Sequence, residues 1–250
     1  GSLFLLAGFT FKIGAVPFHF WGPDVYDGAS NAVLMYMATV VKIAGIYALV
    51  NVFGQVFRDS YGFWIDLVSL IIVLSMFYGY ITAWKQISFR RLIAYSSIAN
   101  AGLMIFALAD THNSNLFLFV AAYAFATIAL VVINSIVNDD TDSLVNWEGI
   151  AWRHPLIGIA LVISLFSLAG IPPFAGFFGK FSLLWSAVPH VPYTAILALI
   201  ASVIGAFVYL RLMMSALKKP SVVVRSPLSL EQLLVLSLTS IAAIGALYFI

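Results

Sequence analysis

Long apolar runs separated by short polar segments dominate the hydropathy pattern of the chain. Each run is roughly 20 residues long, the length that an α-helix needs to cross a bilayer, whereas a membrane β-strand would show about ten residues of alternating polarity. Turn-forming residues such as Gly22-Pro23-Asp24 mark the connections. The pattern predicts about eight membrane-spanning helices, at residues 3–20, 30–53, 63–84, 91–109, 114–137, 156–187, 193–217 and 230–250.

Composition supports this prediction. Of the 250 residues, 63% are apolar and 9% are charged, whereas about 25% are charged in a typical soluble domain. So few charges cannot cover a water-exposed surface, and in lipid the peptide groups must bond to one another within helices or a closed barrel. The sequence therefore predicts an all-α polytopic membrane protein. Because no linker divides the chain, it is expected to form a single transmembrane domain over residues 1–250.

Composition also excludes several classes of function. The chain has no cysteine, so it cannot form disulfides, a thiolate nucleophile, a cysteine zinc site or an iron–sulfur cluster. No glycine-rich nucleotide-binding fingerprint is present. The net charge of +2 includes no basic stripe of the kind that binds nucleic acid. We therefore expect no redox cofactor, no metal and no nucleic acid on this chain.

Two predicted spans contain helix-breaking residues. The first contains Gly14 and Pro17, and the sixth contains Gly170-Ile171-Pro172-Pro173. Because proline removes a helical hydrogen bond and clashes with the preceding turn, both helices should be kinked or broken within the membrane. The tripeptide Leu-Ala-Gly also occurs in both, at residues 6–8 and 168–170. Paired interrupted spans are typical of inverted-repeat transporters, although proline kinks without a function are also common in membrane helices.

The basic residues divide unequally between the two sides of the membrane. If the spans alternate in direction, Arg58 lies on one side, and the opposite side receives Lys85, Arg90, Arg91, Arg153, Lys218, Lys219 and Arg225. Loops rich in lysine and arginine remain on the cytoplasmic side or its organellar equivalent. Both termini are therefore expected on the other face.

Three lysines lie within the predicted spans. Lys12 and Lys42 lie near mid-span, about 13 Å from either interface, too far for the ammonium group to snorkel completely to water. Lys180 follows the second proline break, and snorkelling remains an alternative explanation there. A charge at mid-bilayer costs about 2.5–3.5 kcal/mol, and an amine removed from water can gain and lose a proton when a neighbouring charge changes. We predict that all three are buried and form a proton path.

His19 lies at the mouth of the first break. It could relay protons because imidazole changes charge near neutral pH, although an interfacial histidine is equally expected there. No acidic residue lies mid-span beside the lysines, since Asp66 and Glu231 are near helix starts. A carboxylate partner must then come from another chain or from an earlier portion of this one. The chain also begins without methionine inside an apolar segment, as expected of a fragment or a split gene product.

Three motifs resemble those of a known family. Residues 16–29, VPFHFWGPDVYDGA, resemble the signature of subunit N of respiratory complex I, also called NADH dehydrogenase subunit 2. Residues 90–102, RRLIAYSSIANAG, and residues 168–181, LAGIPPFAGFFGKF, are similar to two further motifs of that family. The spacing between the motifs also fits. The related M and L subunits differ at the Asp-Val-Tyr and Ser-Ser-Ile-Ala-Asn positions.

The resemblance implies an antiporter-like fold of fourteen helices with two inverted repeats, of which this chain would hold the seventh helix onward. Residues 1–53 would end the first repeat, residues 63–217 would form the second, and residues 230–250 would be the terminal helix. Lys12, Lys42 and Lys180 match family lysines that carry protons between two half-channels. A separate chain supplying the first six helices would then provide the buried glutamate.

The resemblance also implies the function of a proton-translocating membrane-arm subunit of NADH:quinone oxidoreductase, with NADH, flavin, iron–sulfur clusters and quinone bound elsewhere in the translocase. Its partners would be other membrane-arm subunits and lipids. The alternatives are a subunit of a multisubunit cation/proton antiporter or membrane-bound hydrogenase, and a truncated structural subunit that no longer pumps. A content of 21 phenylalanines favours an organelle genome, hence the mitochondrial inner membrane, with a bacterial plasma membrane as the alternative.

Overall fold

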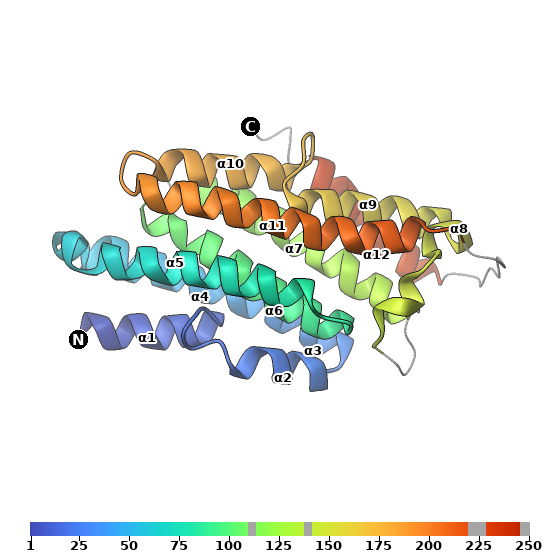
Figure 1. The fold of residues 1–250 in the computed structure, drawn as a ribbon, viewed down its shortest axis with the longest axis horizontal. Helices are drawn as coiled ribbons and strands as arrows, with labels where there is room; N and C mark the ends of the chain where they lie inside the picture. The colour runs from blue at the N-terminus through green and yellow to red at the C-terminus, as the bar shows by residue number, and fades with distance from the viewer. Residues whose placement is uncertain (110–113, 138–141, 220–228, 246–250) are drawn as a thin grey trace.

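The computed structural model describes residues 1–109, 114–137, 142–219 and 229–245 of the chain. In this part the backbone is helical almost throughout, and no β-strand occurs. The helices run roughly along one long axis and stack in layers, with the N-terminal helices on one side of the bundle (Figure 1). The predicted all-α polytopic fold is confirmed.

The elements of the first half are mostly α-helices joined by short 3-10 and π-helical segments. They are α1 (Ser2–Ile13), α2 (Trp21–Gly28), α3 (Asn31–Tyr36), the π-helix η1 (Met37–Val41), α4 (Lys42–Asn51), the π-helix η2 (Val52–Val56), the 3-10 helix η3 (Arg58–Ser60), α5 (Tyr61–Trp84), α6 (Phe89–Ile105) and the 3-10 helix η4 (Phe106–Leu108).

The second half contains longer helices and one irregular connection. Its elements are α7 (Ser114–Val137), the 3-10 helix η5 (Leu144–Trp147), α8 (Ile150–Arg153), α9 (Pro155–Ala169), α10 (Ala175–Ala187), α11 (Pro192–Leu217) and α12 (Leu230–Gly245). Helix α7 contacts six other elements, α3, η1, α6, α9, α10 and α12, so it occupies the middle of the bundle.

Five helical stretches among the described residues are long and apolar enough to cross a membrane: Asn31–Val56, Arg58–Trp84, Phe89–Leu108, Leu116–Val137 and Pro192–Leu217. Helices α1 and α9 and part of α12 are shorter apolar helices. The predicted spans therefore correspond to observed helices, with ends that differ by a few residues outside the two breaks. Residues 246–250 of the last predicted span lie outside the described residues.

Both predicted breaks are confirmed. Helix α1 ends at Ile13 rather than continuing to residue 20, because Gly14 adopts a left-handed conformation with φ of 73°. The Phe11 carbonyl in the last turn accepts the Gly14 N–H at 3.1 Å and also the indole N–H of Trp21 at 2.9 Å, so the residue after the break is bonded to the end of α1. Helix α9 ends in the same way at Gly170, whose φ is 75°.

The two Leu-Ala-Gly tripeptides occupy different places in their helices. Gly8 lies inside α1, whereas Gly170 terminates α9. The matching glycines are Gly14 and Gly170, the two left-handed residues at the helix ends, and each stands three positions before a proline. Backbone conformation rather than the tripeptide therefore relates the two breaks.

The turn predicted at Gly22-Pro23-Asp24 is also wrong, because these residues belong to helix α2. Proline is tolerated in the first turn of a helix, where its missing N–H would have no helical acceptor. Asp24 lies in the same turn, where a carboxylate interacts favourably with the helix dipole. Turn-forming residues here begin a short helix.

One end of the bundle, which we call the basic end, carries the cations predicted to share one side: Lys85, Arg90, Arg91, Arg153, Lys218 and Lys219. Arg211 joins them through hydrogen bonds to the carbonyls of Trp84 and Gln86. Arg58 lies at the other end, beside Ala109 and His190. The predicted division of these cations is confirmed, while Arg225 lies outside the described residues. Which end faces the cytoplasm stays a prediction.

Asp142 ties the connection after α7 to the start of α6 at the basic end. Its carboxylate accepts hydrogen bonds from the Arg90 backbone N–H at 2.7 Å, from the Ser88 hydroxyl at 2.5 Å and from the Asn134 side-chain amide at 3.1 Å. Arg91 forms a separate ion pair with Asp27 of α2 at 2.8 Å. The N-terminus of α6 is therefore held by carboxylates from two distant parts of the chain.

Replacement of Asp142 by alanine should destabilise the protein by about 1–3 kcal/mol, because it removes a helix N-terminal acceptor and leaves partly buried donors without a partner. The measurement is Tm of the purified protein in detergent. Asp66→Ala is the matched control, because Asp66 is exposed and has no hydrogen bond or ion pair with the described residues. Equal Tm values for the two variants would contradict this role.

Candidate functional site

Lys42 is buried in the described bundle, with 3% of its surface exposed. It begins α4 directly after the π-helix η1, and such π segments change the helical register and are frequent at functional sites. Its Nζ donates a hydrogen bond to the Ser97 carbonyl of α6 at 2.6 Å. The predicted burial of Lys42 is confirmed.

Ser97, which accepts from Lys42, also has hydroxyl-bearing side chains near it. The Tyr123 hydroxyl of α7 donates to Ser97 Oγ at 3.1 Å, and Tyr26 of α2 lines the same small cavity as Lys42 and Ser97. Among the described residues, no carboxylate lies within ion-pair distance of Lys42. The Lys42 amine therefore donates to a neutral oxygen atom rather than to a carboxylate.

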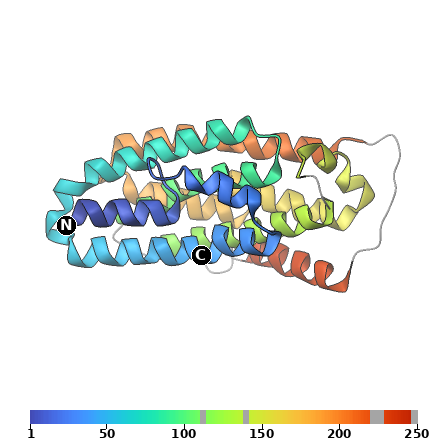
Figure 2. The same ribbon diagram turned by 90° about the horizontal axis from the view of Figure 1, so that it is seen from below.

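Lys12 is exposed in the structure, contrary to prediction. It lies in the last turn of α1, which runs along the outside of the bundle (Figure 2). Phe4 and Phe11 of the same helix are 87% and 48% exposed. An apolar helix with large side chains on every face offers no periodicity from which its buried side could be predicted.

Lys12 and Lys42 nevertheless meet at one small cavity beside the first break. The cavity has a volume of about 20 Å³, and its lining also includes Gly14, Tyr26 and Ser97. A cavity of this size has room for one water molecule, and its lining offers polar partners. The structure thus brings two of the three predicted lysines to a common space.

Lys180 is buried as well, with 5% of its surface exposed. Its Nζ donates to the Leu168 carbonyl at 2.5 Å, within the last turn of α9, where carbonyls have no helical donor and the helix dipole is negative. A Cβ on Gly170 would lie 2.9 Å from Lys180 Cδ. The broken helix therefore supplies the acceptor for this amine, and the glycine leaves room for its side chain.

Two further glycines set the position of Lys180 on α10. A Cβ on Gly176 would lie 1.9 Å from the Ser167 carbonyl oxygen, and one on Gly179 would lie 2.6 Å from Phe119 Cα of α7. Such contacts are shorter than real Cβ atoms make. Close approach of α10 to α9 and α7 thus requires both glycines.

Helix α7 contacts the surroundings of both buried lysines. Phe119 contacts Gly179, next to Lys180, and Tyr123, one turn later, reaches Ser97, next to the Lys42 contact. Lys180 does not line the cavity shared by Lys12 and Lys42. Because positions 119 and 123 are one turn apart on the same face of α7, one face of this central helix contacts the surroundings of both Lys180 and Lys42.

His19 lies in the first break, half-buried, with its ring centroid 4.4 Å from that of Tyr78 in an edge-on contact. Its Nδ1 is buried without a hydrogen-bond partner in the described chain. It does not line the cavity of Lys12 and Lys42. The structure keeps His19 near the break but does not bring it into contact with a lysine.

A buried polar cluster on the other face of α6 was missed from the sequence. Tyr209 of α11 shares a 2.5 Å hydrogen bond with Ser96 and accepts one from the Asn100 amide at 3.1 Å. Tyr80 of α5 donates to Asn100 at 3.5 Å. The adjacent serines of the Ser-Ser-Ile-Ala-Asn segment, in a helix that is buried almost throughout, are the signal that could have indicated it.

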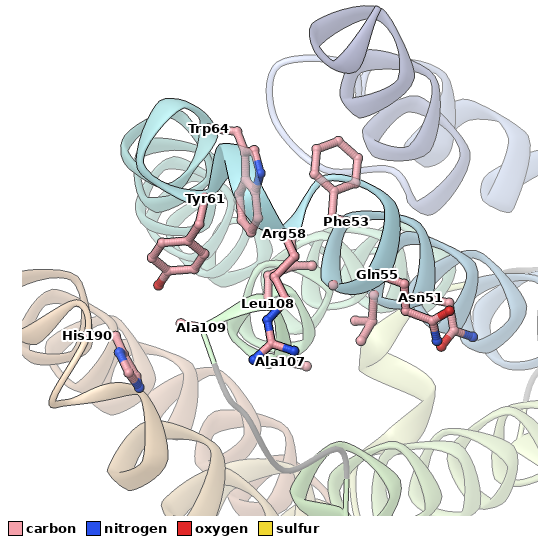
Figure 3. A pocket seen from close by; sticks show the side chains of 12 residues that line it. Asn51, Phe53, Gln55, Arg58, Tyr61, Trp64, Ala107, Leu108, Ala109 and His190 are labelled. Carbon is pink, nitrogen blue, oxygen red and sulfur yellow. The ribbon is translucent and has the colours of Figure 1, made fainter.

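A larger hollow of about 420 Å³ lies at the end opposite the basic end. Figure 3 shows Arg58, Asn51 and Gln55 around it, with His190 approaching from the turn between α10 and α11. None of the predicted lysines lines this hollow. No group of three or more His, Asp or Glu side chains that could hold a metal occurs in the described residues.

Residues 1–244 match the family described as NADH:quinone oxidoreductase/Mrp antiporter, TM. NADH-quinone oxidoreductase subunit N of Pelobacter propionicus is 37% identical over 230 residues, covering 90% of this chain and 49% of that protein. A chain of respiratory complex I from Thermus thermophilus with bound aureothin has a TM-score of 0.87 at 32% identity, covering 96% of this chain and 55% of that chain. A chain of an archaeal membrane-bound sulfane sulfur reductase has a TM-score of 0.87 at 26% identity, covering 97% and 51%. The chain spans about half the length of the curated relatives it matches.

Proposed function

The chain belongs to the NADH:quinone oxidoreductase/Mrp antiporter membrane family, and on this premise we propose that it serves proton translocation in a membrane-arm subunit of an NADH:quinone oxidoreductase. The observation that carries the proposal is the pair of buried amines. Lys42 and Lys180 each donate to a backbone carbonyl, and neither has a carboxylate partner among the described residues.

An amine in this setting suits proton exchange. The carbonyl orients the side chain and accepts its hydrogen bond, but it does not neutralise a positive charge as a carboxylate would. Because a low-dielectric interior screens charges weakly, a charge that approaches or leaves nearby strongly changes the balance between ammonium and neutral amine. Charge movement driven by quinone reduction elsewhere can then be converted into proton uptake and release at Lys42 and Lys180.

The position of Lys12 indicates where partner helices would bind. It lies on an exposed apolar face of α1 and also borders the Lys42 cavity. We propose that further helices, on another chain or in another part of the same polypeptide, cover this face and bring a carboxylate to Lys12. Other membrane-arm subunits and lipids would complete the surroundings. His19 is proposed as a relay at the first break, supported by its unpartnered Nδ1.

The chain is proposed to hold no redox cofactor itself. Its lack of cysteine removes the ligands that iron–sulfur clusters use, so NADH, flavin, clusters and quinone would bind elsewhere in the assembly. For localisation we propose a bacterial plasma membrane, because the relatives described above are bacterial and archaeal. They lend no support to the mitochondrial inner membrane predicted from phenylalanine content.

Replacement of Lys42 by methionine tests this proposal. We expect proton translocation to fall severalfold, by less than the loss of a fully acting acid–base group, because Lys12 borders the same cavity and can partly replace the missing amine. The measurement is NADH-driven acidification of proteoliposomes containing the assembled complex, with oxidoreductase activity followed in parallel. Lys85→Met, a change of an exposed lysine at the basic end, is the control. Unchanged pumping in both variants would instead indicate a structural subunit.

A further inference from the structure

An apolar groove opens on the surface of the bundle where α8, α9 and α11 meet. Its volume is about 340 Å³, and it is lined by Ala151, Pro155, Gly158, Ile159, Val162 and Leu217, among others. It begins at the basic end, since Pro155 is the first residue of α9 and Leu217 the last of α11. From Pro155 to Ile163 it extends about 12 Å along the helix, so it lies parallel to the acyl chains of a surrounding bilayer.

The shape of the groove depends on close helix contact. A Cβ on Gly158 would lie 2.7 Å from Ala151 Cβ, so the glycine lets α8 lie directly against α9. Leu156 and Ile159, on the outward face of α9, are 62% and 58% exposed. Apolar side chains on the outer face of a membrane-spanning helix lie against lipid or protein rather than water.

A cationic rim borders the mouth of the groove. Trp152 donates its indole N–H to the Leu217 carbonyl at 2.8 Å, and Lys219 Nζ lies 5.9 Å from the centroid of the Trp152 ring. Lys219 forms no ion pair with a described acidic residue, whereas Lys218 pairs with Glu148 at 3.3 Å. With Arg153, the rim carries three positive charges and one negative charge. An aromatic ring beside unpaired cations is typical of the headgroup region of a membrane.

From this juxtaposition we propose that the groove between α8, α9 and α11 binds an anionic phospholipid, with one acyl chain along α9 and the phosphate at Lys219. The apolar lining fits the chain, and the positive rim complements the headgroup charge. The basic end is also the end predicted to face the leaflet that is rich in anionic lipids. This site is independent of the buried lysines, so it stands or falls separately from the proposed function.

The test uses the assembled complex in liposomes that contain phosphatidylglycerol with a photoactivatable acyl chain. Phosphatidylcholine with the same acyl chain is compared at the same mole fraction, and labelling of residues 151–163 is quantified by mass spectrometry. We expect phosphatidylglycerol to label this segment severalfold more than phosphatidylcholine. Lys219→Gln should lower phosphatidylglycerol labelling about fivefold, since one basic residue near an anionic surface contributes about 1 kcal/mol.

Matched variants test the cationic rim and the apolar groove separately. Lys85→Gln removes an exposed lysine from the same end of the bundle but away from the groove, and labelling should not change. Val162→Trp should fill the groove and reduce labelling by both lipids, whereas Leu199→Trp, on an exposed part of α11, should not. Equal labelling by the two lipids, equal effects of Lys219→Gln and Lys85→Gln, or no labelling because a partner helix covers the groove would each overturn the proposal.

Discussion

Replacement of Lys180 by methionine should reduce proton translocation by about tenfold or more, the largest effect expected for any single lysine of the chain. The reason is that Lys180 does not line the cavity that Lys12 and Lys42 share, so neither of these lysines is placed to replace its amine. Methionine has a similar length and tolerates a buried site, so the change removes the exchangeable proton with little change in packing. NADH-driven acidification of proteoliposomes measures the effect.

Arginine at the same position separates proton exchange from charge alone. Lys180→Arg keeps a positive charge but cannot release its proton at any physiological pH, so we expect pumping to be lost in this variant too. Lys85→Met is the control for a general loss of charge. Wild-type proton stoichiometry in Lys180→Met, or full pumping by Lys180→Arg, would contradict the assigned role.

Hydropathy was sufficient to place most of the helices, because a helix that spans a bilayer needs a long apolar segment, and such segments are visible in the sequence. The breaks were predictable for a local reason as well, since Pro17 and the Pro172-Pro173 pair cannot continue a helix. Helix α2 was missed because Gly22-Pro23-Asp24 suits a turn and a helix start equally well, and only the surrounding packing decides between them.

The orientation and hydrogen-bond partners of the lysines could not be predicted from the sequence. Helix α1 is apolar on all sides, so its sequence does not indicate that Lys12 faces outward. The acceptors of the two buried amines are main-chain carbonyls of Ser97 and Leu168, and every residue has such a carbonyl. Which carbonyl meets which amine depends on how α4 packs on α6 and where α9 ends. These are tertiary features without a sequence signature.

The second break shows how that packing creates a site. In the last turn of α9 the carbonyl groups lack helical donors, and the Lys180 amine donates a hydrogen bond to one of them, that of Leu168. The lysine comes from α10, which begins after the break and lies against the end of α9. The side-chain oxygen of Ser167 accepts the Gly176 N–H at 3.2 Å and joins the two half-helices. The break is therefore the means by which a buried amine obtains an oriented acceptor inside the membrane.

Replacement of Gly176 by alanine should disrupt this arrangement more than any other single methyl group. The new Cβ would lie 1.9 Å from the Ser167 carbonyl oxygen and 2.6 Å from its carbonyl carbon. Backbone atoms cannot rotate away as a flexible side chain can, so α10 must move from α9 by about 1 Å. Overpacking of this kind costs about 1–3 kcal/mol or more, and a displacement of about 1 Å at a reacting group can reduce a rate about a hundredfold.

We therefore expect Gly176→Ala to lower Tm of the purified protein and to reduce proton translocation even where the complex still assembles. Gly62→Ala is the matched control, because a Cβ there has no atom within 4 Å and alanine favours a helix over glycine by about 1 kcal/mol. Its Tm should stay equal or rise slightly. Wild-type Tm and pumping in Gly176→Ala would show that α9 and α10 do not touch at this position. The Lys180 amine would then lack the positioning on which its proton exchange depends.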